Sequence, residues 1–109
     1  MSSNFLFICS RNQWRSRTAE DLFKNIEDIS VRSAGTSSSA RIKVNEKLLE
    51  WADFIFVMEK HHKQWLQQKY PFLLNDRQVV IMDIPDEYEY MDAELIDMLE
   101  RVMEPYLSL

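Results

Sequence analysis

The sequence has few of the residues that cross-link or bend a chain. Its 109 residues include one cysteine, one glycine and three prolines. A single cysteine cannot form an internal disulfide, which suits the reducing cytoplasm. No apolar run approaches about 18 residues and no charged, apolar and small-residue leader is present, so we expect neither a membrane span nor a secretory signal.

Positive charge is outnumbered, with 13 Lys and Arg against 18 Asp and Glu. The resulting net charge of −5 argues against general nucleic-acid binding, for which a basic stripe is expected. The acidic residues concentrate between positions 83 and 104, which is typical of a solvated helix face. Arg11, Arg15 and Arg17 crowd a short stretch near the start, and a locally positive pocket can attract an anion to an acidic protein.

Apolar patterning predicts alternating strands and helices. We expect strands at residues 5–8, 29–33, 53–58 and 78–82. We expect helices that begin near residue 15 or 16 and that cover residues 44–51, 60–70 and 92–106. Four strands alternating with helices imply an α/β three-layer sandwich, with a four-stranded parallel sheet flanked by helices. The length and the 46% hydrophobic content fit one domain over residues 1–109.

The only cysteine, Cys9, ends the first predicted strand, and Arg15 opens the helix that follows a short loop. Backbone N–H groups of such a loop and first helical turn lack helical partners, so they can converge on an anion. Arg15 can grip two phosphate oxygens, and the Ser16 hydroxyl can reach the sulfur. A free cysteine is usually a buried core residue, but the Cys-x5-Arg-Ser spacing between a strand and a helix favours a reactive thiolate.

The segment after the fourth predicted strand, residues 83–90, belongs at the same edge of the sheet, where ligands bind in such folds. Asp86 follows Pro85 and can act as a general acid and base beside an anion, with Asp83 as the competing carboxyl group. Tyr88 and Tyr90 either form an aromatic wall for a ring-bearing substrate or pack on the sheet edge. The segment can equally be an acidic connection to the last helix.

These stretches carry a resemblance to a known family. Residues 5–23, FLFICSRNQWRSRTAEDLF, resemble the nucleophile loop and first helix of the low-molecular-weight protein tyrosine phosphatases. Residues 33–36 resemble the segment after that family's second strand, and residues 83–88 its general-acid loop. The resemblance implies a phosphomonoester hydrolase, a protein tyrosine phosphatase that works through a phosphocysteine intermediate.

The resemblance also implies roles for single residues. Cys9 corresponds to the nucleophile, Arg15 to the phosphate-binding arginine, and Asp86 to the general acid. Phosphate-binding or loop-supporting roles fall on Ser10, Arg11, Asn12, Gln13, Trp14, Ser16 and Ser33, and Tyr88 lines the pocket mouth. The implied substrate is a phosphorylated protein or a small aryl phosphate, and inorganic phosphate or sulfate fits the same site. No metal or cofactor is needed, because arginine and loop amides hold the charge.

The chain departs from the family pattern at several positions. Arg11 stands where the family usually has glycine. Trp14 replaces a second loop cysteine, so a protective disulfide with Cys9 is not available. The chain is shorter between Gly35 and Trp51, where a histidine of the loop-bracing network would lie.

Three other functions fit parts of the pattern. They are a phospho-binding regulatory module without turnover, an arsenate-type reductase that borrows a small thiol, and a phosphocysteine carrier. His61 and His62 could suggest a metal site, but adjacent helical residues point to different sides, and we interpret them as a surface pair.

Overall fold

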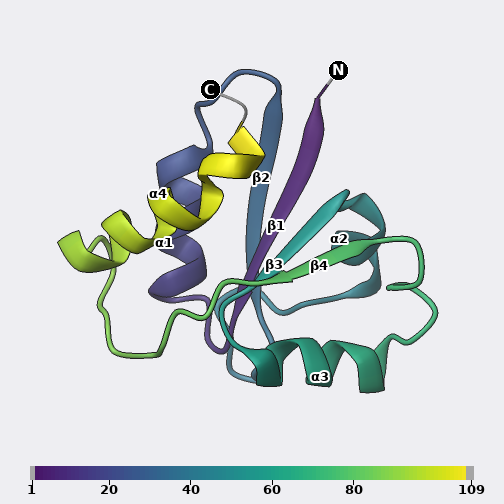
Figure 1. Cartoon of the computed structure of the whole chain (residues 1–109). Coiled ribbons are helices and arrows are strands. Elements are labelled where there is room, and N and C mark those ends of the chain that lie inside the picture. The colour runs from purple at the N-terminus through teal and green to yellow at the C-terminus, as the bar shows by residue number, and fades with distance from the viewer. Residues whose placement is uncertain (1, 108–109) are drawn as a thin grey trace.

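The computed structural model describes residues 2–107 of the chain and contains four strands and four helices in alternation (Figure 1). The strands are β1 (Ser3–Cys9), β2 (Ile29–Gly35), β3 (Phe54–Val57) and β4 (Gln78–Ile81). The helices are α1 (Arg15–Phe23), α2 (Glu46–Trp51), α3 (Lys60–Lys69) and α4 (Ala93–Leu107). The predicted order of elements is confirmed.

The four strands form one parallel sheet in the order β2-β1-β3-β4. Helices α1 and α4 cover one face of the sheet, and α2 and α3 lie on the other (Figure 1). The predicted three-layer α/β sandwich is confirmed. Because all strands run in the same direction, the segments that follow β1, β3 and β4 meet at one edge of the sheet.

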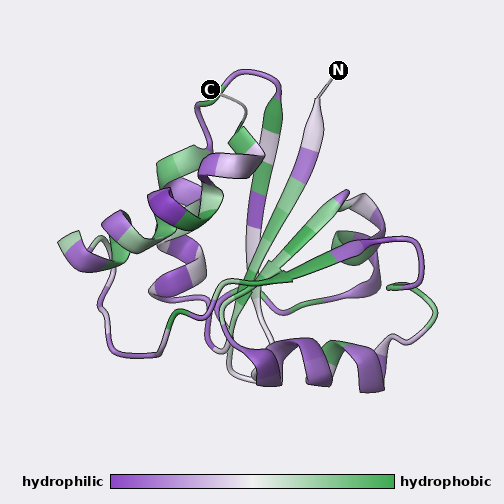
Figure 2. Ribbon diagram, viewed as in Figure 1, coloured by the Kyte–Doolittle hydropathy of each residue, from purple (hydrophilic) through white to green (hydrophobic). Residues whose placement is uncertain are grey.

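Successive side chains of β1 enter two separate cores. Phe5, Phe7 and Cys9 face the core under α1 and α4, whereas Leu6 and Ile8 face the core under α2 and α3. From Phe5 to Cys9 this central strand is apolar, because that part is covered on both faces (Figure 2). Each of its large apolar side chains contributes about 1.5–3 kcal/mol by burial, so the strand holds Cys9 in a fixed place.

Aromatic rings fill the core under α1 and α4. Phe7 stacks on Phe56 with ring centroids 5.1 Å apart, and Tyr106 of α4 meets Phe56 edge-on at 5.0 Å. Helix α4 buries Leu95 and Leu99 against this core, while its carboxylates remain exposed. The predicted solvated acidic face is therefore confirmed for this helix.

Several boundaries differ by one or two residues from those that the sequence predicted. Strand β2 continues past its predicted end at residue 33 to Gly35, which pairs with Cys9 of β1. Helix α2 begins at Glu46 instead of residue 44, because Asn45 caps it by accepting a hydrogen bond from the Leu48 N–H at 2.9 Å. Among the described residues, no helix combines the length and apolar character needed to cross a membrane.

Candidate active site

The thiol of Cys9 lies at the end of β1 and is held by the loop that leads into α1. Its Sγ accepts a hydrogen bond from the Asn12 backbone N–H at 3.2 Å and lies 3.0 Å from the Ser16 Oγ. The Asn12 side-chain amide donates to the same Ser16 Oγ at 2.7 Å. The one proton of the Ser16 hydroxyl has two acceptors within reach, the Cys9 Sγ at 3.0 Å and the Ala34 carbonyl oxygen at 3.3 Å, and a negatively charged sulfur is the stronger of the two. Negative charge on Cys9 is therefore stabilised from two directions.

The loop needs a left-handed backbone at Asn12 and not at Arg11. Asn12 has φ 57°, and Arg11 is not among the described residues with positive φ. Asparagine adopts this conformation more readily than most residues do. Arginine in place of the family's usual glycine therefore brings no left-handed strain to position 11.

The backbone carbonyls of residues 9–12 all turn away from the thiol and are bound by the segment 36–41. The bonds run from Thr36 N to Cys9 O at 3.0 Å, Ser37 N to Ser10 O at 2.9 Å, Arg41 N to Arg11 O at 3.0 Å, and Arg41 Nε to Asn12 O at 3.0 Å. A loop whose carbonyls point outward can present its N–H groups inward. The segment 36–41 thus holds the loop from behind in a shape that can bind an anion.

Gly35 makes this close approach possible. A Cβ atom at this position would lie 2.4 Å from the Ser10 carbonyl oxygen and 2.7 Å from the Ala40 Cβ. Both distances are shorter than any ordinary contact of a Cβ atom. The requirement for glycine here is one of space, since Gly35 does not have a positive φ.

Arg15 is almost fully buried and is oriented by partners from two distant segments. Its Nη1 donates to the Glu59 carboxylate and to the Ile84 carbonyl, the latter at 2.8 Å. Nε and Nη2 lie along the other edge of the guanidinium group. These two donors remain available for a partner that accepts two hydrogen bonds. Burial opposes the charge on Glu59, but the hydrogen bond and charge of Arg15 outweigh it and hold the pKa of Glu59 below its usual value.

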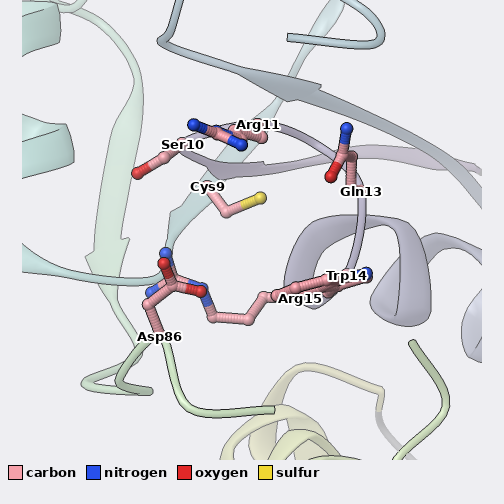
Figure 3. A pocket seen from close by; sticks show the side chains of 7 residues that line it. All are labelled: Cys9, Ser10, Arg11, Gln13, Trp14, Arg15 and Asp86. Carbon is pink, nitrogen blue, oxygen red and sulfur yellow. The ribbon is translucent and has the colours of Figure 1, made fainter. Parts of the chain in front are cut away.

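Asp86 lies in the wall of the pocket that contains Cys9, and its Oδ1 is 3.7 Å from the Arg15 Nε. The cavity of about 200 Å³ is lined by Cys9, Ser10, Arg11, Gln13, Trp14, Arg15 and Asp86 (Figure 3). Asp83 instead lines a separate hollow together with Glu59 and His61. The structure therefore brings Asp86, and not Asp83, into the cavity of the thiol.

The aromatic side chain at the mouth of this cavity is Trp14, which is 44% exposed. Tyr88 packs against the core under α1 and α4, so it does not line the cavity. Tyr90 donates a hydrogen bond to Asp21 of α1, and Arg17 lies over its ring. Tyr88 therefore packs on the core, whereas the exposed Tyr90 lies against α1, and neither ring lines the cavity.

Ser33 is buried in β2, but its hydroxyl donates to the Glu20 carboxylate instead of to the loop. Glu20 in turn lies 4.0 Å from the Arg41 guanidinium, which binds the Asn12 carbonyl. Ser33 is thus connected to the loop through two intervening side chains.

The interpretation of the two histidines as a surface pair is wrong for His62, which is fully buried. Its Nδ1 accepts a hydrogen bond from the Glu59 N–H at 3.0 Å, and its Nε2 lies 2.9 Å from the Ser10 Oγ. Burial lowers the pKa of His62 to about 3, so the ring is neutral. Glu59, His61 and His62 lie close enough to hold a metal ion, but both nitrogens of His62 already have partners.

Sequence reasoning missed four residues that support the loop: Gly35, Arg41, Glu59 and His62. Glu59 and His62 form a capping box at the start of α3. The Glu-x-x-His spacing directly after a predicted strand is the signal that could have placed both residues at the active edge of the sheet. No comparable local signal marks Gly35 or Arg41, because their partners lie across the fold.

A parallel sheet with a cysteine loop between β1 and α1 is the architecture of the low-molecular-weight protein tyrosine phosphatases, and the chain has that fold. Wzb from Vibrio vulnificus, solved with benzylphosphonate, is 18% identical with a TM-score of 0.81 over 99% of each chain. The tyrosine phosphatase Wzb from Escherichia coli K30, solved with phosphate, is 20% identical with a TM-score of 0.80 over 99% of this chain and 98% of that one.

The YwlE arginine phosphatase from Geobacillus stearothermophilus is 16% identical, with a TM-score of 0.77 over 97% of this chain and 91% of that one. Comparison with protein-family models gives no match, and comparison with curated proteins gives none. At these identities the likeness establishes the fold, and the expected family resemblance is confirmed at that level.

Proposed function

We propose that this chain is a metal-independent phosphomonoester hydrolase that acts through a phosphocysteine on Cys9. The observation that carries the proposal is the environment of the thiol. Sγ is held by the Asn12 N–H and the Ser16 hydroxyl in a cavity that also contains the buried Arg15 and the carboxyl group of Asp86. A nucleophile, an oxyanion-binding group and a proton donor therefore occur together.

In the first half-reaction the Cys9 thiolate attacks phosphorus and the bond from phosphorus to the leaving oxygen breaks. Asp86, in its acid form, gives its proton to that oxygen. The Nε and Nη2 edge of Arg15 binds two of the phosphoryl oxygens, since its Nη1 is occupied by Glu59 and Ile84. The loop N–H groups stabilise the charge that develops on the oxygens.

In the second half-reaction water attacks the phosphorus of the phosphocysteine. The Asp86 carboxylate takes a proton from that water, and the bond between sulfur and phosphorus breaks to restore the thiolate. Inorganic phosphate leaves, and both groups return to their starting states.

For the substrate we favour an aryl phosphate, with phosphotyrosine in a protein as its natural form. The fold alone does not distinguish between these substrates, because the similar structures include both a tyrosine phosphatase and an arginine phosphatase. Support comes from Trp14, whose exposed ring at the cavity mouth offers an aromatic leaving group a flat surface. A reducing compartment such as the cytoplasm suits a site that depends on one free thiol.

The test is hydrolysis of an aryl phosphate by the wild type and by the Cys9→Ser protein, with a chelator present. We expect wild-type turnover that the chelator does not change and that Cys9→Ser abolishes. Binding of phosphate without turnover by the wild type would refute the proposal in favour of a phospho-binding module.

A further inference from the structure

His62 fixes the direction in which the Ser10 hydroxyl donates. The Glu59 N–H points at Nδ1 of His62, so this nitrogen carries a lone pair and no proton. In a neutral imidazole the proton must then be on Nε2, the atom that lies 2.9 Å from the Ser10 Oγ. His62 is therefore the donor of this hydrogen bond, and Ser10 is the acceptor.

The hydroxyl proton of Ser10 is consequently free for another partner. The Ser10 side chain lines the cavity that contains Cys9 and Arg15 (Figure 3). A phosphoryl group bound there brings oxygens that accept hydrogen bonds. A donor hydroxyl that is itself polarised by a buried N–H is well suited to meet them.

The arrangement is rigid as well as directional. His62 has no exposed surface, and it belongs to the capping box that begins α3. The same capping box supplies Glu59 to Arg15. One helix start therefore orients two groups of the cavity through two separate hydrogen bonds, and neither histidine nitrogen can rotate away without losing a partner.

We propose that Ser10 is a further donor to the bound phosphoryl group and that His62 is the positioning residue which turns the Ser10 hydroxyl into that donor. The inference rests on the proposed phosphatase function. Ser10 thereby joins the loop N–H groups and Arg15 as a hydrogen-bond donor to the phosphoryl group. His62, which takes no part in the reaction itself, gains a role in orienting Ser10.

The first experiment measures the dissociation constant of inorganic phosphate at neutral pH by phosphorus NMR titration. Losing a hydrogen bond to a charged group should weaken phosphate binding about tenfold in Ser10→Ala. Ser10→Thr keeps the hydroxyl and should bind within about twofold of the wild type, whereas Ser30→Ala, which removes an exposed hydroxyl of β2 outside the cavity, serves as the matched control. Wild-type affinity in Ser10→Ala, or equal losses in Ser10→Ala and Ser10→Thr, would overturn the donor role.

The second experiment separates positioning by His62 from a general structural role. In His62→Asn the side-chain oxygen can still accept a hydrogen bond from the Glu59 N–H, but the shorter side chain no longer reaches Ser10. It should weaken phosphate binding severalfold in the wild-type background and leave binding unchanged in the Ser10→Ala background. An equal loss in both backgrounds would show that His62 acts independently of Ser10 and would overturn this half of the proposal.

These measurements also separate the inference from the proposed function. If the wild type binds phosphate but hydrolyses no aryl phosphate, the phosphatase proposal fails, and the Ser10 and His62 variants still decide the inference. If the wild type binds no phosphate, both fail together.

Discussion

Replacing Gly35 by alanine should damage catalysis without touching any group that reacts. The new Cβ would lie 2.4 Å from the Ser10 carbonyl oxygen, and real Cβ contacts essentially never fall under 3.0 Å. The loop or strand β2 must therefore move by at least about 0.6 Å. A shift approaching 1 Å at a catalytic loop costs on the order of 100-fold in rate. We expect kcat for an aryl phosphate to fall by about that factor.

The Ala40 Cβ is the second atom that the new side chain meets, at 2.7 Å, and this allows a matched control. In the double variant Gly35→Ala, Ala40→Gly the contact with residue 40 is removed and the contact with Ser10 remains. The rate should stay low in the double variant, while thermal unfolding reports whether each protein is folded. A Gly35→Ala protein with wild-type kcat would refute the reasoning, and so would full rescue by Ala40→Gly.

Three further predictions concern single side chains. Arg15→Lys keeps the charge but loses the paired donors Nε and Nη2, so kcat/KM for an aryl phosphate should fall about 100-fold or more. A loss under about threefold would contradict the proposed binding of two phosphoryl oxygens by Arg15. Asp86→Asn should slow phenyl phosphate far more than an activated aryl phosphate, and Asp83→Asn should show no such difference; the reverse pattern would identify Asp83 as the acid. Because burial lowers the pKa of His62 to about 3, its stabilising contribution is fully present above its unfolded value of 6.5 and is lost as pH falls towards 3. Urea unfolding should therefore show about 1 kcal/mol less stability at about pH 5.5 than at pH 7, a loss that His62→Asn should lack.

The fold was predictable because its signals are local. Alternating apolar runs and amphipathic stretches define the strands and helices, and the parallel sheet follows from their alternation. The neighbourhood of Cys9, Asn12 and Ser16 was equally accessible, since these residues lie within one strand-loop-helix unit. In such a unit, spacing along the chain nearly determines spacing in the structure.

The rest of the candidate site depends on contacts between distant segments. His62 meets Ser10 across 52 positions of the sequence, and a two-residue motif on a helix does not indicate which side chain enters the core. The resemblance implies that Tyr88 lines the pocket mouth, whereas its ring packs against the core under α1 and α4, because a connecting segment can place a ring on either side. The segment 36–41 has the composition of an ordinary loop, yet its N–H groups bind the carbonyls behind Cys9.

The account depends most directly on a covalent bond between Cys9 and phosphorus. The measurement is mass spectrometry of the protein quenched in acid during turnover of an aryl phosphate, with the Cys9→Ala protein treated in parallel. We predict a phosphoryl group on the peptide that contains Cys9, formed at least as fast as product accumulates and absent from the variant. Turnover without that adduct, or a phosphoryl group on another residue, would contradict the proposed mechanism.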